Sequence, residues 1–331
     1  AVWTTCMLFF QVVLLGGYAY AHWLATRLRS RGQALLQGAV LALSLALLAA
    51  QWRHWGGPLI PAAAWKPADP DAPVRHLLLL LAVTVGLPYF VLATTSPLLQ
   101  AWCSRARPGV APYRLYMLSN AGSLLALLTY PVLIEPALAL RAQATVWAVI
   151  FVVFAATYLL CAVRSASGSS VGAVTDRDAE TVGAVTDRDA APPALAADAG
   201  VSWRHRILWI VLPALASTLL LAVTNQICQE LAVIPFLWVL PLTLYLLSFI
   251  ICFGNPRWYV RAVYLPAMLT AVPVVAYVMT QPLEMPVRWQ IADYAALLFC
   301  ACMFCHGEVV ARRPDPRHLT TFYLAISIGG A

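Results

Sequence analysis

Long apolar stretches recur along the whole sequence and are separated by short loops that carry most of its charge. Of the 331 residues, 62% are hydrophobic and only 11% are charged, whereas about 25% of the residues in an ordinary soluble domain are charged. A run of about 20 apolar residues is long enough to cross the hydrocarbon core of a bilayer as a helix. The sequence therefore predicts an all-α polytopic membrane protein, with the lipid bilayer as its first partner and no water-soluble domain.

About nine complete spans and a partial tenth fit between the charged loops. Several contain proline, which membrane helices tolerate because neighbouring helices can satisfy the freed backbone groups, so we expect kinks there. The predicted spans lie at 2–24, 34–50, 76–99, 115–139, 142–163, 207–228, 232–253, 260–280 and 289–310, and the partial span begins at 319.

The basic residues predict the orientation of the spans. Most of the 21 lysine and arginine residues lie in alternate loops, and loops enriched in this way face the cytoplasm. Because the arginines are spread over short loops and form no basic face, nucleic acid is not expected as a partner. The basic loops lie at 27–31, 105–114, 164–206, 257–261 and 312–317.

The longest polar segment, 164–206, contains VGAVTDRDA at 171–179 and again, unchanged, at 182–190. Serine, glycine, alanine, aspartate and proline dominate it, and such a composition cannot bury enough apolar area to fold. We interpret it as a flexible cytoplasmic linker, and the duplication as a mark of tolerance rather than of function.

A fainter repeat relates the two sides of this linker. On each side an Arg-Pro pair precedes a helix start in which a tyrosine lies six residues before a glycine, as LYMLSNAG at 115–122 and as FYLAISIG at 322–329. Two related half-bundles, here 1–163 and 207–331, joined by a long loop are typical of parallel-repeat transporters of the major facilitator type. On this interpretation one helix is expected before Ala1 and at least one after Ala331.

Four stretches, in this order and spacing, resemble the membrane half of the bacterial fused major-facilitator/spermidine-synthase-like proteins. The resemblance implies a major-facilitator-like two-half helical bundle in the bacterial inner membrane, linked to a cytoplasmic aminopropyltransferase-like domain. No glycine-rich nucleotide loop follows a strand in this sequence, so we expect no aminopropyltransferase activity from these residues. The stretches are LATTSPLLQAW at 92–102, YRLYMLSNAGSLLALLTYPVLIEP at 113–136, QELAVIPFLWVLPLTLYLLSFIICF at 229–253 and CHGEVVARRPDPRHLTTFYLAISIGG at 305–330.

Acidic and amide side chains at the outer helix ends are candidate binding residues, because charge is costly inside a membrane. Converging in one cavity, they would form an acidic vestibule suited to a cation or an amine. The alternative is that each acid caps a helix end near the lipid headgroups, where its cost is small. The candidate residues are Glu135, Asn225, Gln226, Gln229, Glu230 and Asp293.

The sequence CMFCH at 302–306 matches the CxxCH pattern of haem attachment. The predicted topology places it at a cytoplasmic helix end, whereas haem of this kind is attached on the outer side. A metal site made by Cys302, Cys305 and His306 is a weak alternative, and we predict no cofactor. The interpretation we favour is a cytoplasmic-end polar cluster in which His306 and Glu308 pair with the arginines that follow, Arg312 and Arg313.

Hydroxyl and amide groups on two other helices leave two interpretations open. The segment Thr94–Pro97 with Gln100, and the group Ser119, Asn120 and Ser123, would line a pathway or would bond to their own backbone and to neighbouring helices.

Two functional hypotheses follow. The first is a transporter-like bundle that binds or moves a small cationic or amine solute. The second is a non-transporting anchor or scaffold for a cytoplasmic enzyme domain or for other subunits of a complex. No catalytic residues are predicted.

Overall fold

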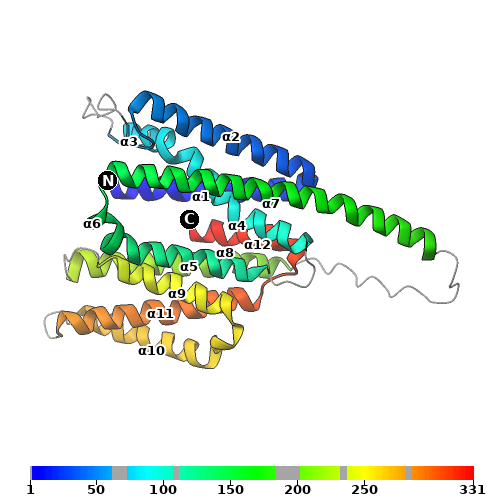
Figure 1. Cartoon of the computed structure of the whole chain (residues 1–331). Coiled ribbons are helices and arrows are strands. Elements are labelled where there is room, and N and C mark those ends of the chain that lie inside the picture. Colours follow the sequence, from blue (N-terminus) through cyan, green and yellow to red (C-terminus); the bar gives the residue numbers. More distant parts are fainter. Residues whose placement is uncertain (1, 62–72, 107–111, 184–201, 232–236, 281–284) are drawn as a thin grey trace. The chain divides into compact units, whose positions relative to one another are not determined.

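The structure, a computed structural model, describes residues 2–61, 73–106, 112–183, 202–231, 237–280 and 285–331. Every regular element in these ranges is a helix (Figure 1). The expected all-α architecture is therefore confirmed. The helices form two compact units, and each is described by itself.

Unit 1 comprises residues 1–110 and 140–203. Its helix α1 packs against α4, and α2 packs along α7. Helix α3 continues through the π-helical segment η2 into α4 without a break, so these three elements form one long span. The bounds are α1 Val2–Arg27, α2 Ser30–Trp55, α3 Pro73–Leu81, η2 Ala82–Gly86, α4 Leu87–Ala106 and α7 Leu140–Gly183.

Unit 2 comprises residues 111–139 and 204–331. Its helix α5 packs against α9, and α11 packs against both α9 and α10. The bounds are α5 Tyr113–Thr129, η3 Tyr130–Ile134, α6 Glu135–Ala137, α8 Trp203–Asn225, η4 Gln226–Leu231, α9 Val239–Gly254, η5 Pro256–Trp258, α10 Arg261–Thr280, α11 Val287–Ala311, η6 Pro316–His318 and α12 Leu319–Gly330.

Eight helices in the described part of the chain are long and apolar enough to cross a membrane, and α9 is a shorter apolar helix. These helices follow the order of the predicted spans. Helix α12 begins at Leu319, where the partial span was predicted to begin. Many large apolar side chains on their outer faces are exposed, as lipid-facing side chains are. The chain is a multi-pass membrane protein.

Proline positions coincide with local changes in helix geometry. The π-helical segment η3 contains Pro131, and η2 ends shortly before Pro88. Proline lacks the backbone N–H that an α-helix needs, and a π-helical turn is one way in which a helix accommodates such a disruption.

Close helix approaches depend on small residues. A Cβ added to Gly17 of α1 would come within 2.6 Å of the Ala93 Cβ of α4, so these two helices touch almost backbone to backbone. In unit 2, a Cβ on Gly329 of α12 would collide with the backbone carbonyl of Ile210 in α8. Small residues at such contacts permit the van der Waals packing that holds membrane helices together.

Two features of the predicted domain division look different in the structure. Helix α5 packs with α9 and so belongs to unit 2, although the repeat assigns it to the first half. Helix α7 continues to Gly183, so the first part of the segment expected to be a flexible linker is helical; no proline occurs in it before Pro192. Residues 184–201 lie outside the described part. The division into repeat halves stays a prediction.

Candidate functional site

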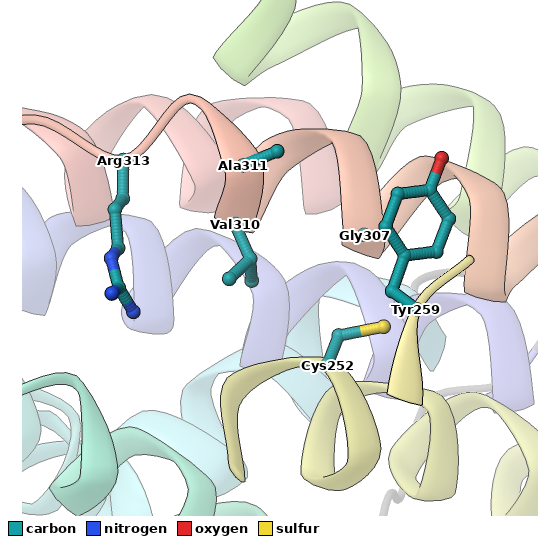
Figure 2. A pocket seen from close by; sticks show the side chains of 6 residues that line it. All are labelled: Cys252, Tyr259, Gly307, Val310, Ala311 and Arg313. Carbon is teal, nitrogen blue, oxygen red and sulfur yellow. The ribbon is translucent and has the colours of Figure 1, made fainter. Parts of the chain in front are cut away.

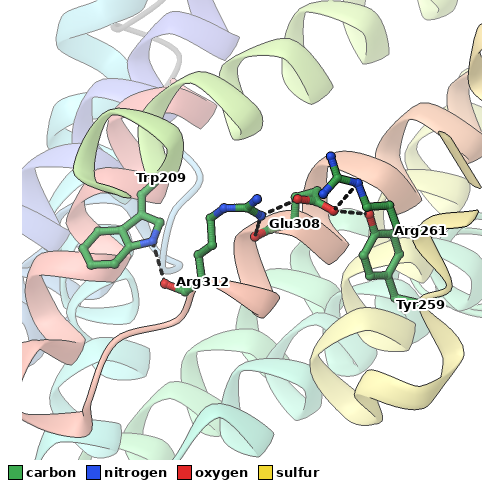
Figure 3. A network of polar contacts seen from close by, with 5 residues as sticks. All are labelled: Trp209, Tyr259, Arg261, Glu308 and Arg312. Atoms are coloured by element: carbon green, nitrogen blue, oxygen red, sulfur yellow. Dashed lines mark hydrogen bonds and ion pairs between the residues drawn. The ribbon is translucent and has the colours of Figure 1, made fainter. Parts of the chain in front are cut away.

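Glu308 is a buried carboxylate near the end of α11, and its side chain is only 7% exposed. It accepts a hydrogen bond of 2.6 Å from the Tyr259 hydroxyl and forms an ion pair with Arg312, one turn later in the chain. The Arg261 Nε atom lies 3.6 Å from the same carboxylate. Figure 3 shows Glu308 between Arg312 on one side and Tyr259 with Arg261 on the other. These partners offset the cost of burying a charge.

Arg312 extends this network to a further helix. Its Nη1 atom also donates to the Glu308 backbone carbonyl at 3.0 Å, and its own carbonyl accepts a 3.0 Å hydrogen bond from the Trp209 indole of α8. We call Trp209, Tyr259, Arg261, Glu308 and Arg312 the Glu308 cluster. The cluster ties together α8, α10, α11 and the loop between α9 and α10.

Tyr259 lies in the loop before α10 and acts as a donor in the cluster. Burial raises the pKa of its phenol, and the Glu308 carboxylate raises that pKa further, while Arg261 opposes the shift. The phenol therefore keeps its proton at neutral pH and can continue to donate to Glu308.

A small cavity lies beside the cluster and has a volume of about 180 Å³. Figure 2 shows Tyr259 at one end of it and Arg313 at the other. A Cβ added to Gly307 would collide with the Tyr259 ring. The missing side chain at Gly307 therefore lets the tyrosine lie flat enough against α11 to reach Glu308.

Arg313 does not join the Glu308 cluster. Its guanidinium lies 5.2 Å from the centroid of the Tyr113 ring, within the range of a cation–π contact. The Tyr113 hydroxyl donates a 2.6 Å hydrogen bond to the Pro314 carbonyl. This second set of contacts fixes the loop after α11 to the start of α5.

His306 is fully buried and pairs with neither arginine. Its Nδ1 lies 2.8 Å from the Ser248 hydroxyl of α9, and its ring stacks on Phe249 with centroids 3.6 Å apart. Its Nε2 has no hydrogen-bond partner among the described residues. The structure thus separates His306 from Glu308, although the sequence suggested that both would organise the arginine-rich loop.

The weak metal candidate is not formed. Within the described ranges, no group of three or more histidine, cysteine, aspartate or glutamate side chains could hold a metal ion. Cys302 and Cys305 are free thiols buried in α11, one helical turn apart, and the Nδ1 of His306 is directed to Ser248. Cys302, Cys305 and His306 are all buried in unit 2.

The predicted outer vestibule is only partly described. Gln226 contacts the Tyr294 hydroxyl of α11 through its side chain, and Asp293 is half-buried next to that tyrosine. Asn225 and Glu135 are exposed. The side chains of Gln229 and Glu230 lie outside the described residues. The structure therefore brings Gln226 to Tyr294 of α11, whereas the convergence of all six residues stays a prediction.

Hydroxyl and amide groups on α4 and α5 bond to their own helices. Thr94 and Thr95 both donate to the Val91 carbonyl, at 2.7 and 3.0 Å. Asn120 donates to the Tyr116 carbonyl at 2.8 Å. The carbonyl that Pro97 leaves without a helical partner is that of Ala93, so the threonines do not compensate for the proline directly.

A stripe of buried polar side chains on α2 was not singled out from the sequence. Gln33, Gln37, Ser44 and Gln51 are each at most 3% exposed, and their spacing of four, seven and seven residues places them on one helix face. This spacing could have been read from the sequence, because all four residues lie in or next to the predicted span 34–50.

The two end glutamines of this stripe are fully bonded. The Gln33 Oε1 atom accepts from the Trp102 indole and from Arg105, both at 2.8 Å. The Gln51 amide donates to the Val83 and Thr84 carbonyls, at 2.8 and 3.1 Å. These bonds join α2 to the long span formed by α3, η2 and α4.

The middle of the stripe is not satisfied. Gln37 donates to the Thr94 hydroxyl at 3.0 Å, but its Oε1 atom has no partner among the described residues, and the same holds for the Ser44, Tyr20 and Tyr158 hydroxyls. The Tyr158 hydroxyl interacts with the Thr94 and Thr95 side chains and lies near Tyr20, but it meets no partner with full hydrogen-bond geometry among the described residues. We call Tyr20, Gln37, Thr94 and Tyr158 the polar node of unit 1; it joins α1, α2, α4 and α7.

Aromatic rings surround the polar node. Tyr20 lies against Phe90 with centroids 5.3 Å apart, and Tyr158 stacks on Trp102 at 5.5 Å. The node therefore combines unpaired oxygen atoms with aromatic faces, and it contains no charged residue.

The chain matches no protein-family model, no curated protein and no solved structure.

Proposed function

We propose that the chain is a transporter-like integral membrane domain of the bacterial inner membrane that binds or moves a small cationic or amine solute. The observation that carries the proposal is the polar node of unit 1. An unsatisfied buried polar atom costs about 1 to 3 kcal/mol, and several such atoms occur among the described residues of unit 1. A solute that donates hydrogen bonds to these oxygens would recover that cost.

The chemistry of the node favours an amine. The unpaired atoms of Gln37, Tyr20 and Tyr158 are oxygens, which accept hydrogen bonds from N–H groups. Aromatic faces attract an ammonium group through the ring quadrupole. The resemblance to spermidine-synthase-like proteins supports the same solute class, and the acids predicted at the outer helix ends would attract cations toward the membrane.

Solute binding by the full chain tests the proposal. The purified protein in lipid nanodiscs is titrated with spermidine and putrescine, and binding is followed by calorimetry. We expect Tyr20→Phe and Tyr158→Phe each to weaken binding by about tenfold, which corresponds to one lost hydrogen bond of about 1.4 kcal/mol. Tyr277→Phe is the matched control, because Tyr277 is an exposed tyrosine of α10 in unit 2. Unchanged binding in both node variants would refute the role of the node.

The alternative is a membrane anchor or scaffold for a cytoplasmic enzyme domain. Exposed arginines of unit 2 favour it, since Arg261 and Arg317 keep 61% and 84% of their side chains exposed and could dock an acidic partner. Binding of neither polyamine, together with loss of complex assembly on replacing Arg261 and Arg317 by glutamine, would support this second function.

A further inference from the structure

Two adjoining cavities lie beside α2 and α7 in unit 1. The first has a volume of about 440 Å³ and is lined almost entirely by apolar side chains, including Leu45, Leu48, Val149 and Val152. The second has a volume of about 280 Å³ and is lined by polar as well as apolar groups. Trp52 and Pro58 line both, so the two cavities adjoin and make one groove with an apolar part and a polar end.

Each part of the groove is lined by one arginine. Arg53 of α2 lines the apolar part near Trp52, and Arg141 lines the polar part together with Thr145. Arg141 is the second residue of α7, where the unpaired backbone N–H groups of a helix start also favour an anion. In the described part of unit 1, neither arginine forms an ion pair with a carboxylate.

The groove has the polarity that a membrane lipid requires. The predicted topology places the end of α2 and the start of α7 at the outer membrane surface. Trp52 and Trp55 line the polar end, and tryptophan is enriched where the hydrocarbon core meets the headgroups. An acyl chain in the apolar part would therefore place its headgroup beside the two arginines.

We propose that this groove binds an anionic phospholipid, with one acyl chain along Leu45, Leu48 and Val152 and the phosphate between Arg53 and Arg141. Charge complementarity selects an anionic lipid over a zwitterionic one. The site is separate from the polar node, since none of the node residues lines the groove, and it does not depend on solute transport.

Native mass spectrometry of the full chain with defined lipids tests the site. The protein is released from mixed micelles that contain phosphatidylglycerol and phosphatidylcholine, and the bound lipids are counted. We expect the wild-type chain to retain one phosphatidylglycerol preferentially. Each juxtamembrane arginine contributes a factor of roughly five to the affinity for an anionic lipid. The affinity of the double variant Arg53→Gln/Arg141→Gln for phosphatidylglycerol should therefore fall roughly 25-fold.

Matched variants separate charge from shape. Arg288→Gln removes an arginine of the same predicted membrane side in unit 2 and should leave lipid retention unchanged. Ala49→Trp fills the apolar part of the groove and should reduce retention of both lipids, whereas Ala50→Trp alters an exposed neighbour that does not line it. Equal retention of the two lipids by the wild-type chain, or undiminished phosphatidylglycerol in the double variant, would overturn the proposal.

Discussion

Tyr116 of α5 and Tyr323 of α12 lie in contact, with ring centroids 4.9 Å apart. They occupy the same position in the two copies of the internal repeat, each six residues before a glycine. Both tyrosines belong to unit 2, and Phe253 packs against Tyr116 in the same cluster.

The Tyr116–Tyr323 contact should be measurable as a coupling energy. We expect the variants Tyr116→Leu and Tyr323→Leu to destabilise the chain by less in combination than the sum of their separate effects, with a coupling of about 0.5 to 1.5 kcal/mol. Unfolding in a denaturing detergent gives the four free energies of the cycle. Strict additivity would show that the two rings contribute only through their separate burial.

Glu308 should contribute far more to stability than the exposed acid next in the chain. Replacing Glu308 by alanine leaves Arg312 and the Tyr259 hydroxyl without their acceptor, and we expect a loss of about 3 kcal/mol. Asp315→Ala is the control. It removes an exposed ion pair with Arg317 at 3.9 Å and one hydrogen bond from the Arg317 backbone N–H, and we expect it to cost about 1 kcal/mol. Similar losses in the two variants would mean that the Glu308 cluster is not a structural tie.

The folded chain should lose stability at alkaline pH because of the Tyr259 phenol. Its pKa is raised in the folded chain by burial and by Glu308, so its contribution is fully present below the ordinary tyrosine pKa of 10.0. Above that pH the unfolded chain releases the proton first, and the folded state loses the contribution. Comparing thermal unfolding of the wild-type chain and Tyr259→Phe on both sides of pH 10.0 isolates this residue. The difference between them should shrink at the higher pH.

The sequence predicted the helices far better than the contacts between them. Apolar length and loop arginines placed α1 and α11 within a few residues, because crossing a bilayer constrains each helix by itself. Which side chains meet depends on how helices pack. Glu308 and Arg312 are four residues apart on one helix, so local spacing suggested their pair, but Tyr259 joins them from a separate loop that no local pattern connects to α11.

Gly307 and Gly122 should respond in opposite directions to alanine. A Cβ on Gly307 would collide with the Tyr259 ring and push it away from Glu308, so Gly307→Ala should destabilise the chain by about 1 to 3 kcal/mol. Gly122 lies inside α5 with nothing within 4 Å of its added Cβ, and Gly122→Ala should stabilise by about 0.5 to 1 kcal/mol. Differential scanning fluorimetry of both variants decides this, and stabilisation by Gly307→Ala would contradict the tight tyrosine contact.

Replacing two buried polar side chains of unit 1 should change the free energy of unfolding in opposite directions. Gln33→Leu removes the acceptor shared by Trp102 and Arg105, leaves two donors without it, and should destabilise by about 2 to 4 kcal/mol. Tyr158→Phe removes a hydroxyl that has no hydrogen-bond partner, leaves the ring packing intact, and should stabilise the chain by up to about 1 kcal/mol. If Tyr158→Phe stabilises the chain and also weakens amine binding, the hydroxyl is retained for ligand binding and not for stability. If Tyr158→Phe instead destabilises unit 1, the hydroxyl is bonded in the folded protein and the polar node is a structural contact between helices.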